Sequence, residues 1–312
     1  MFYDQRGSEL FEEITRLPEY YLTRVEQALL EAHAAAWIHA IRPRTLVELG
    51  AGSAAKTRVI LDAMRTEGVG GTYVPVDISA DFLERTAAAL RHEYAGLLVV
   101  PVPADFTRSV ELPSSLPRPA LLTFLGSTIG NFTTPAAVDL VRRVRGAMQP
   151  GDRFLLGADL RKDVAVLEAA YNDSRGVTAE FNRNMLRVLN RDFGADFDVE
   201  SFRHRAIYDG QEHRIEMHLV STRAQTNHIP GIGDLVLHAG ETIRTEISCK
   251  YDRPSVEELF TAARLEMTEW REDPDRLFAL SVAAPAGEVE RPDFDGVSNP
   301  PAAGSSPRSP SG

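Results

Sequence analysis

The chain has 312 residues, of which 43% are hydrophobic and 25% are charged, as in ordinary globular proteins. Its formal net charge of −11 argues against a nucleic-acid partner, which requires a concentrated basic surface. The apolar runs are too short to span a membrane, and the N-terminus lacks the charged-then-apolar pattern of a signal peptide. Because Cys249 is the one cysteine, no internal disulfide can form, and we expect a cytoplasmic protein.

Lysine is rare in this sequence. Only three of the 34 basic residues are lysine, namely Lys56, Lys162 and Lys250. We interpret the preference for arginine mainly as a bias of coding composition, although Lys56 lies inside a glycine-containing motif.

The first half of the chain alternates between strand and helix patterns. Residues 8–40 have apolar residues at helical spacing, interrupted at Pro18. From Thr45 onward, short apolar runs alternate with amphipathic segments, a pattern that predicts a parallel sheet with helices on both faces. The predicted strands are 45–49, 73–77, 97–103, 120–125 and 153–158, and the predicted helices are 53–66, 80–93 and 135–148, the last with Thr134 as N-cap before Pro135.

After Asp159 this alternation stops. We expect helices at 163–172 and 176–190, antiparallel strands within 195–250, a helix with a capping box of Ser255 and Glu258, and a final strand pair. The fold prediction is a doubly wound α/β domain with an inserted α+β substrate-binding lobe. Its segments are an N-terminal helical cap (1–40), the α/β domain (41–174), the lobe (175–250), a return to the sheet (251–284) and a Pro-, Gly- and Ser-rich disordered tail (285–312).

The segment "VELGAGSAAK" has the layout of a cofactor loop. Gly50 and Gly52 lie between a strand and a helix, where they allow a tight turn and close approach of a ligand to the backbone. The third glycine of the dinucleotide fingerprint is missing. Asp77 ends the second strand, where a carboxylate can accept both ribose hydroxyls, and Asp105 and Phe106 follow the third strand, where adenine can be bound. A cofactor with an adenosine but no phosphates fits this layout, and S-adenosylmethionine (SAM) fits best.

Plainer interpretations remain open for each of these residues. The glycines are compatible with a simple strand-to-helix turn, Asp77 with a helix-entry residue, and Asp105 with an ordinary turn residue. Lys56 would ordinarily be solvated, but here it could reach the methionine carboxylate of SAM or pair with an acidic neighbour. An NAD-dependent oxidoreductase and a non-catalytic adenosine-binding module are the alternative functions.

A less generic motif, "LGSTIGNF" at residues 125–132, follows the fourth strand. Together with "FYDQRGSELFEEITRLPEYY", "ELGAGSAAKTRVILDA" and "IRTEISCKY", it closely resembles the histidine-specific SAM-dependent methyltransferases, the L-histidine Nα-methyltransferases of ergothioneine biosynthesis. The resemblance runs from Phe2 to Ala284. It implies a Rossmann-like methyltransferase fold, L-histidine as the small-molecule substrate, and trimethylation of its α-amine to hercynine. We expect a monomer.

The resemblance also implies roles for individual residues. Those that match the family's SAM contacts are Gly50, Lys56, Asp77, Asp105 and Phe106. Those that match positions holding the amino-acid backbone of histidine are Tyr20, Gly126, Asn131 and Tyr171, of which we assign Asn131, Tyr20 and Gly126 to catalysis. Those around the imidazole are Met217, Glu246 and Ser248, and Tyr3 falls in a motif that lines the site.

Strand alternation supports part of this assignment. In "TIRTEISCK" it places Ile243, Thr245, Ile247 and Cys249 on one face and Arg244, Glu246, Ser248 and Lys250 on the other. Glu246 can then accept an imidazole N–H while the Ser248 hydroxyl meets the other ring nitrogen. On pattern alone a solvent-facing strand edge is favoured. Tyr20, Tyr171 and Met217 could also be packing residues, and Asn131 a turn residue. Tryptophan is the alternative substrate, although an indole has one N–H and no acceptor for the groups around it.

Two departures from the family pattern stand out. The chain begins almost at the family motif, without a preceding segment of a few dozen residues that we would expect, and Leu22 replaces the more usual proline. We expect no metal site, because His213 and His218 lie five apart on a predicted strand and so face opposite ways, and one cysteine cannot form a thiolate site. There is also no nucleophile-elbow sequence for a Ser–His–Asp triad.

Overall fold

The structure, a computed structural model, describes residues 4–51, 54 and 56–288. Tyr3, Gly52 and the predicted disordered tail beyond Glu288 lie outside the described residues. None of the described helices combines the length and apolar character needed to cross a bilayer.

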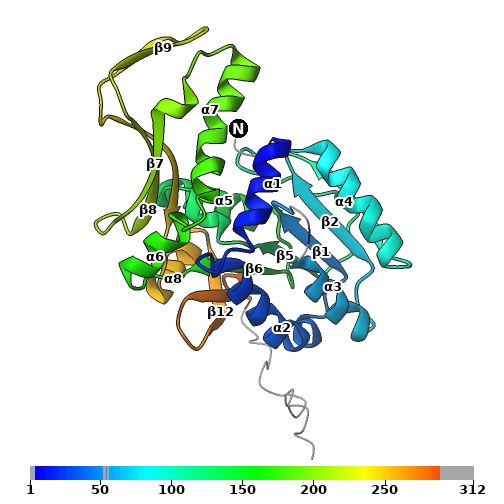
Figure 1. Cartoon of the computed structure of the whole chain (residues 1–312). Coiled ribbons are helices and arrows are strands. Elements are labelled where there is room, and N and C mark those ends of the chain that lie inside the picture. The colour runs from blue at the N-terminus through cyan, green and yellow to red at the C-terminus, as the bar shows by residue number, and fades with distance from the viewer. Residues whose placement is uncertain (1–3, 52–53, 55, 289–312) are drawn as a thin grey trace, which may run out of the picture.

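One large sheet organises the molecule (Figure 1). Its order is β12-β13-β6-β5-β1-β2-β3, and β4 also pairs with β2. The strands from β1 to β6 pair in parallel, whereas β13 runs antiparallel to β6 and to β12. The strands are β1 (Thr45–Leu49), β2 (Thr72–Asp77), β3 (Leu98–Val99), β4 (Val102–Pro103), β5 (Ala120–Phe124), β6 (Arg153–Asp159), β12 (Leu265–Glu272) and β13 (Phe278–Pro285).

Helices cover both faces of this sheet, because successive strand residues point to opposite sides. Leu46 of β1 belongs to an apolar cluster that includes the buried faces of the helices on one side of the sheet, and the next residue, Val47, belongs to the cluster on the other side. The first layer consists of α2 (Leu22–Ile41), α3 (Thr57–Thr66) and α4 (Ala80–Glu93), and the second of α5 (Thr134–Ala147) and α8 (Arg253–Ala262). The prediction of a doubly wound α/β fold is confirmed.

Two predicted helix starts are wrong. The N-cap of α5 is Thr133, so that Thr134 and Pro135 form the first turn. The N-cap of α8 is Asp252, whose side chain accepts from the Ser255 N–H while the Ser255 side chain accepts from the Asp252 backbone. In both cases the proline belongs inside the first turn, where its missing N–H costs nothing, so the helix begins one to three residues earlier than predicted. The single strand predicted at 97–103 is two short strands, β3 and β4.

A second body of structure, residues 164–249, stands beside the sheet (Figure 1). A three-stranded antiparallel sheet of order β11-β8-β7 and the hairpin β9-β10 pack around a small apolar core of their own. The elements are α6 (Val164–Tyr171), α7 (Val177–Phe193), the 3₁₀ turn η2 (Val199–Ser201), β7 (Phe202–Asp209), β8 (Arg214–Ser221), β9 (Gln225–Ile229), β10 (Gly233–Leu237) and β11 (Thr242–Cys249). We call residues 175–250 the lobe.

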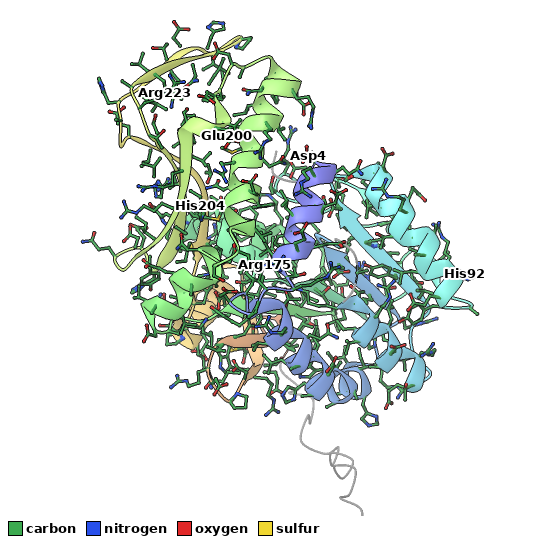
Figure 2. The ribbon with its side chains drawn as sticks, viewed as in Figure 1. Asp4, His92, Arg175, Glu200, His204 and Arg223 are labelled. Carbon is green, nitrogen blue, oxygen red and sulfur yellow. The ribbon has the colours of Figure 1, made fainter. Side chains whose placement is uncertain are left out.

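Side-chain contacts tie the lobe to the rest of the chain. His204 of β7 is hydrogen-bonded to Asn182 (2.9 Å) and to the carbonyl of Tyr171 (2.8 Å), and Figure 2 shows it on the lobe side of the molecule. His213 lies in the turn before β8 with a left-handed φ of 50°, so its predicted place on a strand is wrong.

The two N-terminal helices have different neighbours. Helix α1 (Gln5–Ile14) packs against α7 of the lobe, whereas α2 packs against α3 and the sheet. Asp4 caps α1 by accepting from the Gly7 N–H (2.8 Å), and its carboxylate also accepts from Asn184 (2.8 Å) and Arg191 (2.7 Å) of α7 (Figure 2). The start of the chain is therefore fastened to the lobe, and α1 closes the space between the lobe and the sheet.

Candidate active site

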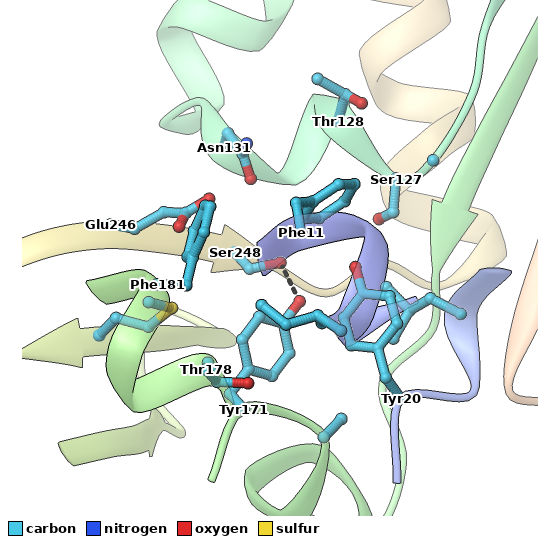
Figure 3. A pocket seen from close by; sticks show the side chains of 15 residues that line it. Phe11, Tyr20, Ser127, Thr128, Asn131, Tyr171, Thr178, Phe181, Glu246 and Ser248 are labelled. Carbon is cyan, nitrogen blue, oxygen red and sulfur yellow. Dashed lines mark hydrogen bonds between the residues drawn. The ribbon is translucent and has the colours of Figure 1, made fainter. Parts of the chain in front are cut away.

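A pocket lies where α1, the lobe and the carboxyl end of β5 meet (Figure 3). The seven residues that the sequence assigned to the methyl acceptor all line it: Tyr20, Gly126, Asn131, Tyr171, Met217, Glu246 and Ser248. The remaining lining residues are Phe11, Ile14, Leu22, Ser127, Thr128, Ala170, Thr178 and Phe181. Segments as far apart as α1 and β11 thus converge on one cavity.

The loop after β5 is held against β11 by a close approach at Gly130. This loop contains the 3₁₀ turn η1 (Thr128–Asn131). A Cβ atom at Gly130 would lie 2.8 Å from the carbonyl oxygen of Cys249 and 3.3 Å from Ser248 Oγ, so no larger residue fits without moving the strand. The missing side chain allows the turn to bring Asn131 to the mouth of the pocket, beside β11.

Glu246 and Ser248 face the pocket together, but the strand that carries them is not regular. A bulge at Thr245 shifts the pairing with β8, so that Arg244 lies opposite His218 while Glu246 lies opposite Met217. The regular alternation of faces is therefore interrupted at the bulge, and the residues before it lie on the opposite face from the one that strict alternation with Glu246 would give them. The predicted placement of Arg244 beside Glu246, and of Ile243 on the opposite face, is wrong. Arg244 instead donates to Glu216 (2.8 Å) on the outer face of the lobe sheet.

The Glu246 carboxylate is available to a ligand. Its side chain makes no hydrogen bond or ion pair within the described part of the chain, and it points into the pocket (Figure 3). Burial raises the pKa of Glu246 to about 7, against the opposing effect of the positive charge on Lys250. An acceptor with no partner in a partly dry cavity favours a ligand that supplies an N–H donor.

A buried network of charged and hydroxyl groups lies behind the pocket wall. Lys250 forms an ion pair with Asp159 (2.7 Å) and donates to Tyr171 (3.0 Å) and to Ser248 (2.8 Å). On the other side of Asp159, Lys162 forms a second ion pair and donates to the Tyr21 hydroxyl (2.6 Å). Sequence reasoning assigned no role to these lysines, although their rarity in the chain was a signal.

Glu26 is a further residue that sequence reasoning missed. It belongs to α2, its side chain is completely buried, and it pairs with Lys56. Both of its carboxylate oxygens accept from the Gly126 N–H, at 2.8 and 2.9 Å. Lys56 therefore pairs with an acidic neighbour, one of the two partners that we considered for it. The Gly126 N–H is occupied, which leaves the Gly126 carbonyl as the backbone group that can meet a substrate.

The five residues predicted to contact the cofactor gather at the carboxyl ends of β1, β2 and β4. Gly50 has a left-handed φ of +70°, and a Cβ there would lie 3.8 Å from the Phe106 ring, so the turn and the ring are neighbours. Asp77 ends β2 and accepts from the Ser79 N–H (3.2 Å), and Asp105 accepts from the Thr107 N–H (3.0 Å).

This end of the sheet has the chemistry that an adenosine group needs. Phe106 supplies an aromatic face, two carboxylates lie at or just after the ends of the neighbouring strands β2 and β4, and the exposed side chain of Ile78 directly follows Asp77. Ile78 was not singled out from the sequence, although an apolar residue with 75% of its surface exposed is unusual. Among the described residues, no group of three or more His, Cys, Asp or Glu side chains is placed to hold a metal ion.

The chain is similar to known proteins along most of its length. The chain is 46% identical over 286 residues to a histidine N-alpha-methyltransferase of Mycobacterium tuberculosis (strain CDC 1551 / Oshkosh), a match that covers 91% of this chain and 88% of that protein. It is 43% identical over 283 residues to the protein of the same name from Mycolicibacterium smegmatis, covering 90% and 88%. It is 32% identical over 291 residues to ergothioneine biosynthesis protein 1 of Neurospora crassa, covering 86% of this chain and 31% of that larger protein.

The match extends to a whole family. Residues 1–285 fit the family described as histidine-specific methyltransferase, SAM-dependent. This range contains every residue that lines the pocket and all five residues predicted to contact the cofactor. The chain therefore belongs to the SAM-dependent, histidine-specific methyltransferases, and is an enzyme whose cofactor is S-adenosylmethionine.

Proposed function

We propose that the protein transfers three methyl groups in succession to the α-amine of L-histidine, giving hercynine (Nα,Nα,Nα-trimethylhistidine), as a step of ergothioneine biosynthesis. The observation that carries this proposal is the pocket itself. It combines the unpaired acceptor Glu246 with the Ser248 hydroxyl on one strand face, a spacing suited to the two nitrogens of an imidazole. The names of the relatives from M. tuberculosis and N. crassa support it.

We assign the cofactor to the carboxyl ends of β1, β2 and β4. Asp77 accepts the ribose hydroxyls, Asp105 and Phe106 hold the adenine, and the turn at Gly50 admits the cofactor to the backbone. Lys56, held by Glu26, faces the methionine end. When bound, SAM supplies a methyl group on a sulfonium that is already activated for transfer.

The protein's own part in the reaction is to position a neutral amine. A protonated amine has no lone pair, so the α-amine must lose a proton before each transfer. We assign Asn131 and the Gly126 carbonyl to orienting the amine in line with the methyl group. Tyr20 is assigned to the carboxylate of the substrate. Because the Tyr171 hydroxyl donates to Ser248 (2.9 Å), we assign the Tyr171 ring, rather than its hydroxyl, to the substrate backbone.

The pocket must also accept a product that carries a permanent positive charge. Aromatic side chains border it at Phe11, Tyr20, Tyr171 and Phe181. The faces of such rings attract cations without forming a bond that would hold the product too tightly. We propose that these rings accommodate the amine as it gains methyl groups.

Tryptophan remains the alternative substrate. An indole has one N–H for Glu246 and no acceptor for Ser248, so it satisfies one of the two groups. The NAD-dependent alternative and the non-catalytic alternative do not apply to a member of this family.

We also propose that the enzyme works in the cytoplasm as a monomer. Sedimentation of the purified protein tests whether it is a monomer.

One experiment tests the proposed function. The full-length protein is incubated with SAM and each of the common amino acids in turn, and the products are separated by mass. We expect histidine to gain one, two and three methyl groups. Methylation of tryptophan in preference to histidine, or of no amino acid at all, would overturn the proposal.

A further inference from the structure

The ammonium group of Lys250 touches both hydroxyl groups of the pocket wall. Its side chain is buried, and its Nζ lies 3.0 Å from the Tyr171 hydroxyl, 2.8 Å from Ser248 Oγ and 2.7 Å from a carboxylate oxygen of Asp159. An ammonium has three N–H donors and no acceptor. The ammonium therefore donates to both hydroxyl oxygens and forms an ion pair with Asp159.

The remaining hydrogen bond joins the two hydroxyl groups. The Tyr171 hydroxyl donates to Ser248 Oγ (2.9 Å; dashed in Figure 3). Ser248 Oγ then accepts from Lys250 and from Tyr171, which occupies both of its lone pairs. The one group left on Ser248 for a ligand is its own proton. Ser248 is thus a donor toward the pocket, whereas Glu246, two residues away on the same face, is an acceptor.

Lys250 keeps its charge because of Asp159. Burial lowers the pKa of Lys250, but the neighbouring Asp159 carboxylate and Tyr171 together outweigh that effect and raise it above the ordinary lysine value. The second lysine on Asp159, Lys162, has its pKa lowered to about 8, mainly by burial. Around neutral pH Lys250 is therefore a charged ammonium group when it donates its hydrogen bond to Ser248.

We propose that Lys250 is a positioning residue that fixes Ser248 as a hydrogen-bond donor, so that the pocket recognises the neutral form of an imidazole. The bare ring nitrogen accepts from Ser248, and the ring N–H donates to Glu246. A ring with two N–H groups, or with an N–H and no bare nitrogen, leaves the Ser248 proton without an acceptor. This inference rests on the proposed histidine substrate and adds which of the two pocket groups donates.

Two ring analogues of histidine separate the two hydrogen bonds. Thiazolylalanine has a bare nitrogen and no N–H, and pyrrolylalanine has an N–H and no bare nitrogen. Dissociation constants for histidine and both analogues are measured by calorimetry with S-adenosylhomocysteine present. We expect Ser248→Ala to weaken histidine and thiazolylalanine about tenfold and to leave pyrrolylalanine within about twofold of the unaltered protein. Weakening of pyrrolylalanine with no change for thiazolylalanine would show Ser248 to be an acceptor and overturn the proposal.

The role of Lys250 is tested by Lys250→Met, which keeps an unbranched side chain, one atom shorter, and removes its donors. We expect the preference for histidine over pyrrolylalanine to fall about tenfold, because Ser248 is then free to turn its proton away from the pocket. Lys250→Arg should restore most of that preference. An equal loss for all three ligands would mean that Lys250 only supports the fold.

Lys162→Met is the matched control. It removes the other lysine of Asp159 but touches neither Ser248 nor Tyr171, so the ratio of histidine to pyrrolylalanine affinity should stay unchanged. Thermal unfolding shows which variants are folded, and the Ser248→Ala result decides the direction of the hydrogen bond even if Lys250→Met does not fold. Failure of the unaltered protein to bind histidine would count against the proposed function, whereas the wrong analogue pattern with histidine binding intact counts against this inference alone.

Discussion

The buried carboxylate of Glu26 accepts, through both of its oxygens, a bifurcated hydrogen bond from the backbone N–H of Gly126, a hundred residues further along the chain. The same carboxylate pairs with Lys56, at the start of the helix that follows the cofactor loop. Glu26 therefore connects an N-terminal helix, the cofactor side and the acceptor side of the site at one point.

Replacement of Glu26 should damage both stability and binding. Glu26→Ala leaves Lys56 and the Gly126 N–H without their partner, and breaking a buried ion pair in this way costs about 3–5 kcal/mol of unfolding free energy. Affinity for SAM and for histidine should fall together. Denaturant unfolding and calorimetry measure these effects. Glu31→Ala, on the exposed side of the same helix, is the control, and a Glu26→Ala variant as stable as that control would contradict the assignment.

Asp77→Ala should reduce SAM affinity with little effect on the fold. A charge-assisted hydrogen bond to the ribose hydroxyls is worth about 1.5–3 kcal/mol, or roughly 10- to 150-fold in the dissociation constant. Calorimetric titration with SAM measures the change. Asp81→Ala, an exposed residue in the first turn of α4, should bind SAM normally. Unchanged affinity in Asp77→Ala would mean that its carboxylate only accepts from Ser79.

Asn131→Ala should separate catalysis from cofactor binding. The side chain is assigned to the amine of the substrate, so methylation of histidine should fall at least tenfold while SAM affinity changes by less than about twofold. Initial rates and calorimetry give the two numbers. Thr133→Ala, an exposed neighbour without a side-chain capping bond, serves as control. Equal losses of rate and SAM affinity would assign Asn131 to the cofactor loop instead.

Glu246→Ala should alter substrate preference. Histidine loses the acceptor for its ring N–H, and kcat/KM should fall roughly 10- to 150-fold, whereas relative activity on tryptophan should rise because space is vacated. SAM binding should be unaffected, since the residue lies in the lobe. Competition between histidine and tryptophan, with products separated by mass, measures the preference. A variant that keeps the full preference for histidine would place the imidazole elsewhere.

Glu246→Gln should also change how stability depends on pH. Burial raises the pKa of Glu246 from 4.5 to about 7, so between these values the folded protein binds a proton that the unfolded chain releases. Stability due to this group therefore falls as pH rises from about 4.5 to about 7, by an amount on the order of 1–3 kcal/mol. Glu48, whose pKa burial also raises to about 7, is the same in both proteins and cancels in the comparison. The free energy of unfolding of both proteins is measured with denaturant at pH 5 and pH 8. It should fall less between these two pH values in Glu246→Gln, and an equal fall in both proteins would contradict the raised pKa.

The sheet and most of its helices could be predicted, because burial on both faces of parallel strands leaves a local pattern in the sequence. Patterns also located the glycine turn at Gly50 and the carboxylate at the end of β2. The residues of the acceptor pocket came mainly from the family resemblance, since α1, η1 and β11 are brought together by long-range packing that no local pattern records.

The errors have a physical cause in each case. The bulge at Thr245 inserts one residue into β11, and strict alternation cannot reveal where a strand changes faces. Glu26 looks like any other acid in an amphipathic helix until its partners are known. The three lysines were set aside as a matter of composition, yet each forms an ion pair with a fully buried carboxylate, Glu26 or Asp159.

The hairpin β9-β10 contributes no residue to the pocket, and its tip at Pro230, Gly231 and Ile232 is exposed. A protease that cuts there divides the pocket between two fragments, with Met217 on the first and Glu246 on the second. The ladder between β8 and β11 would still join them. We therefore expect the two fragments to be inactive apart and to regain methyl transfer when they reassemble.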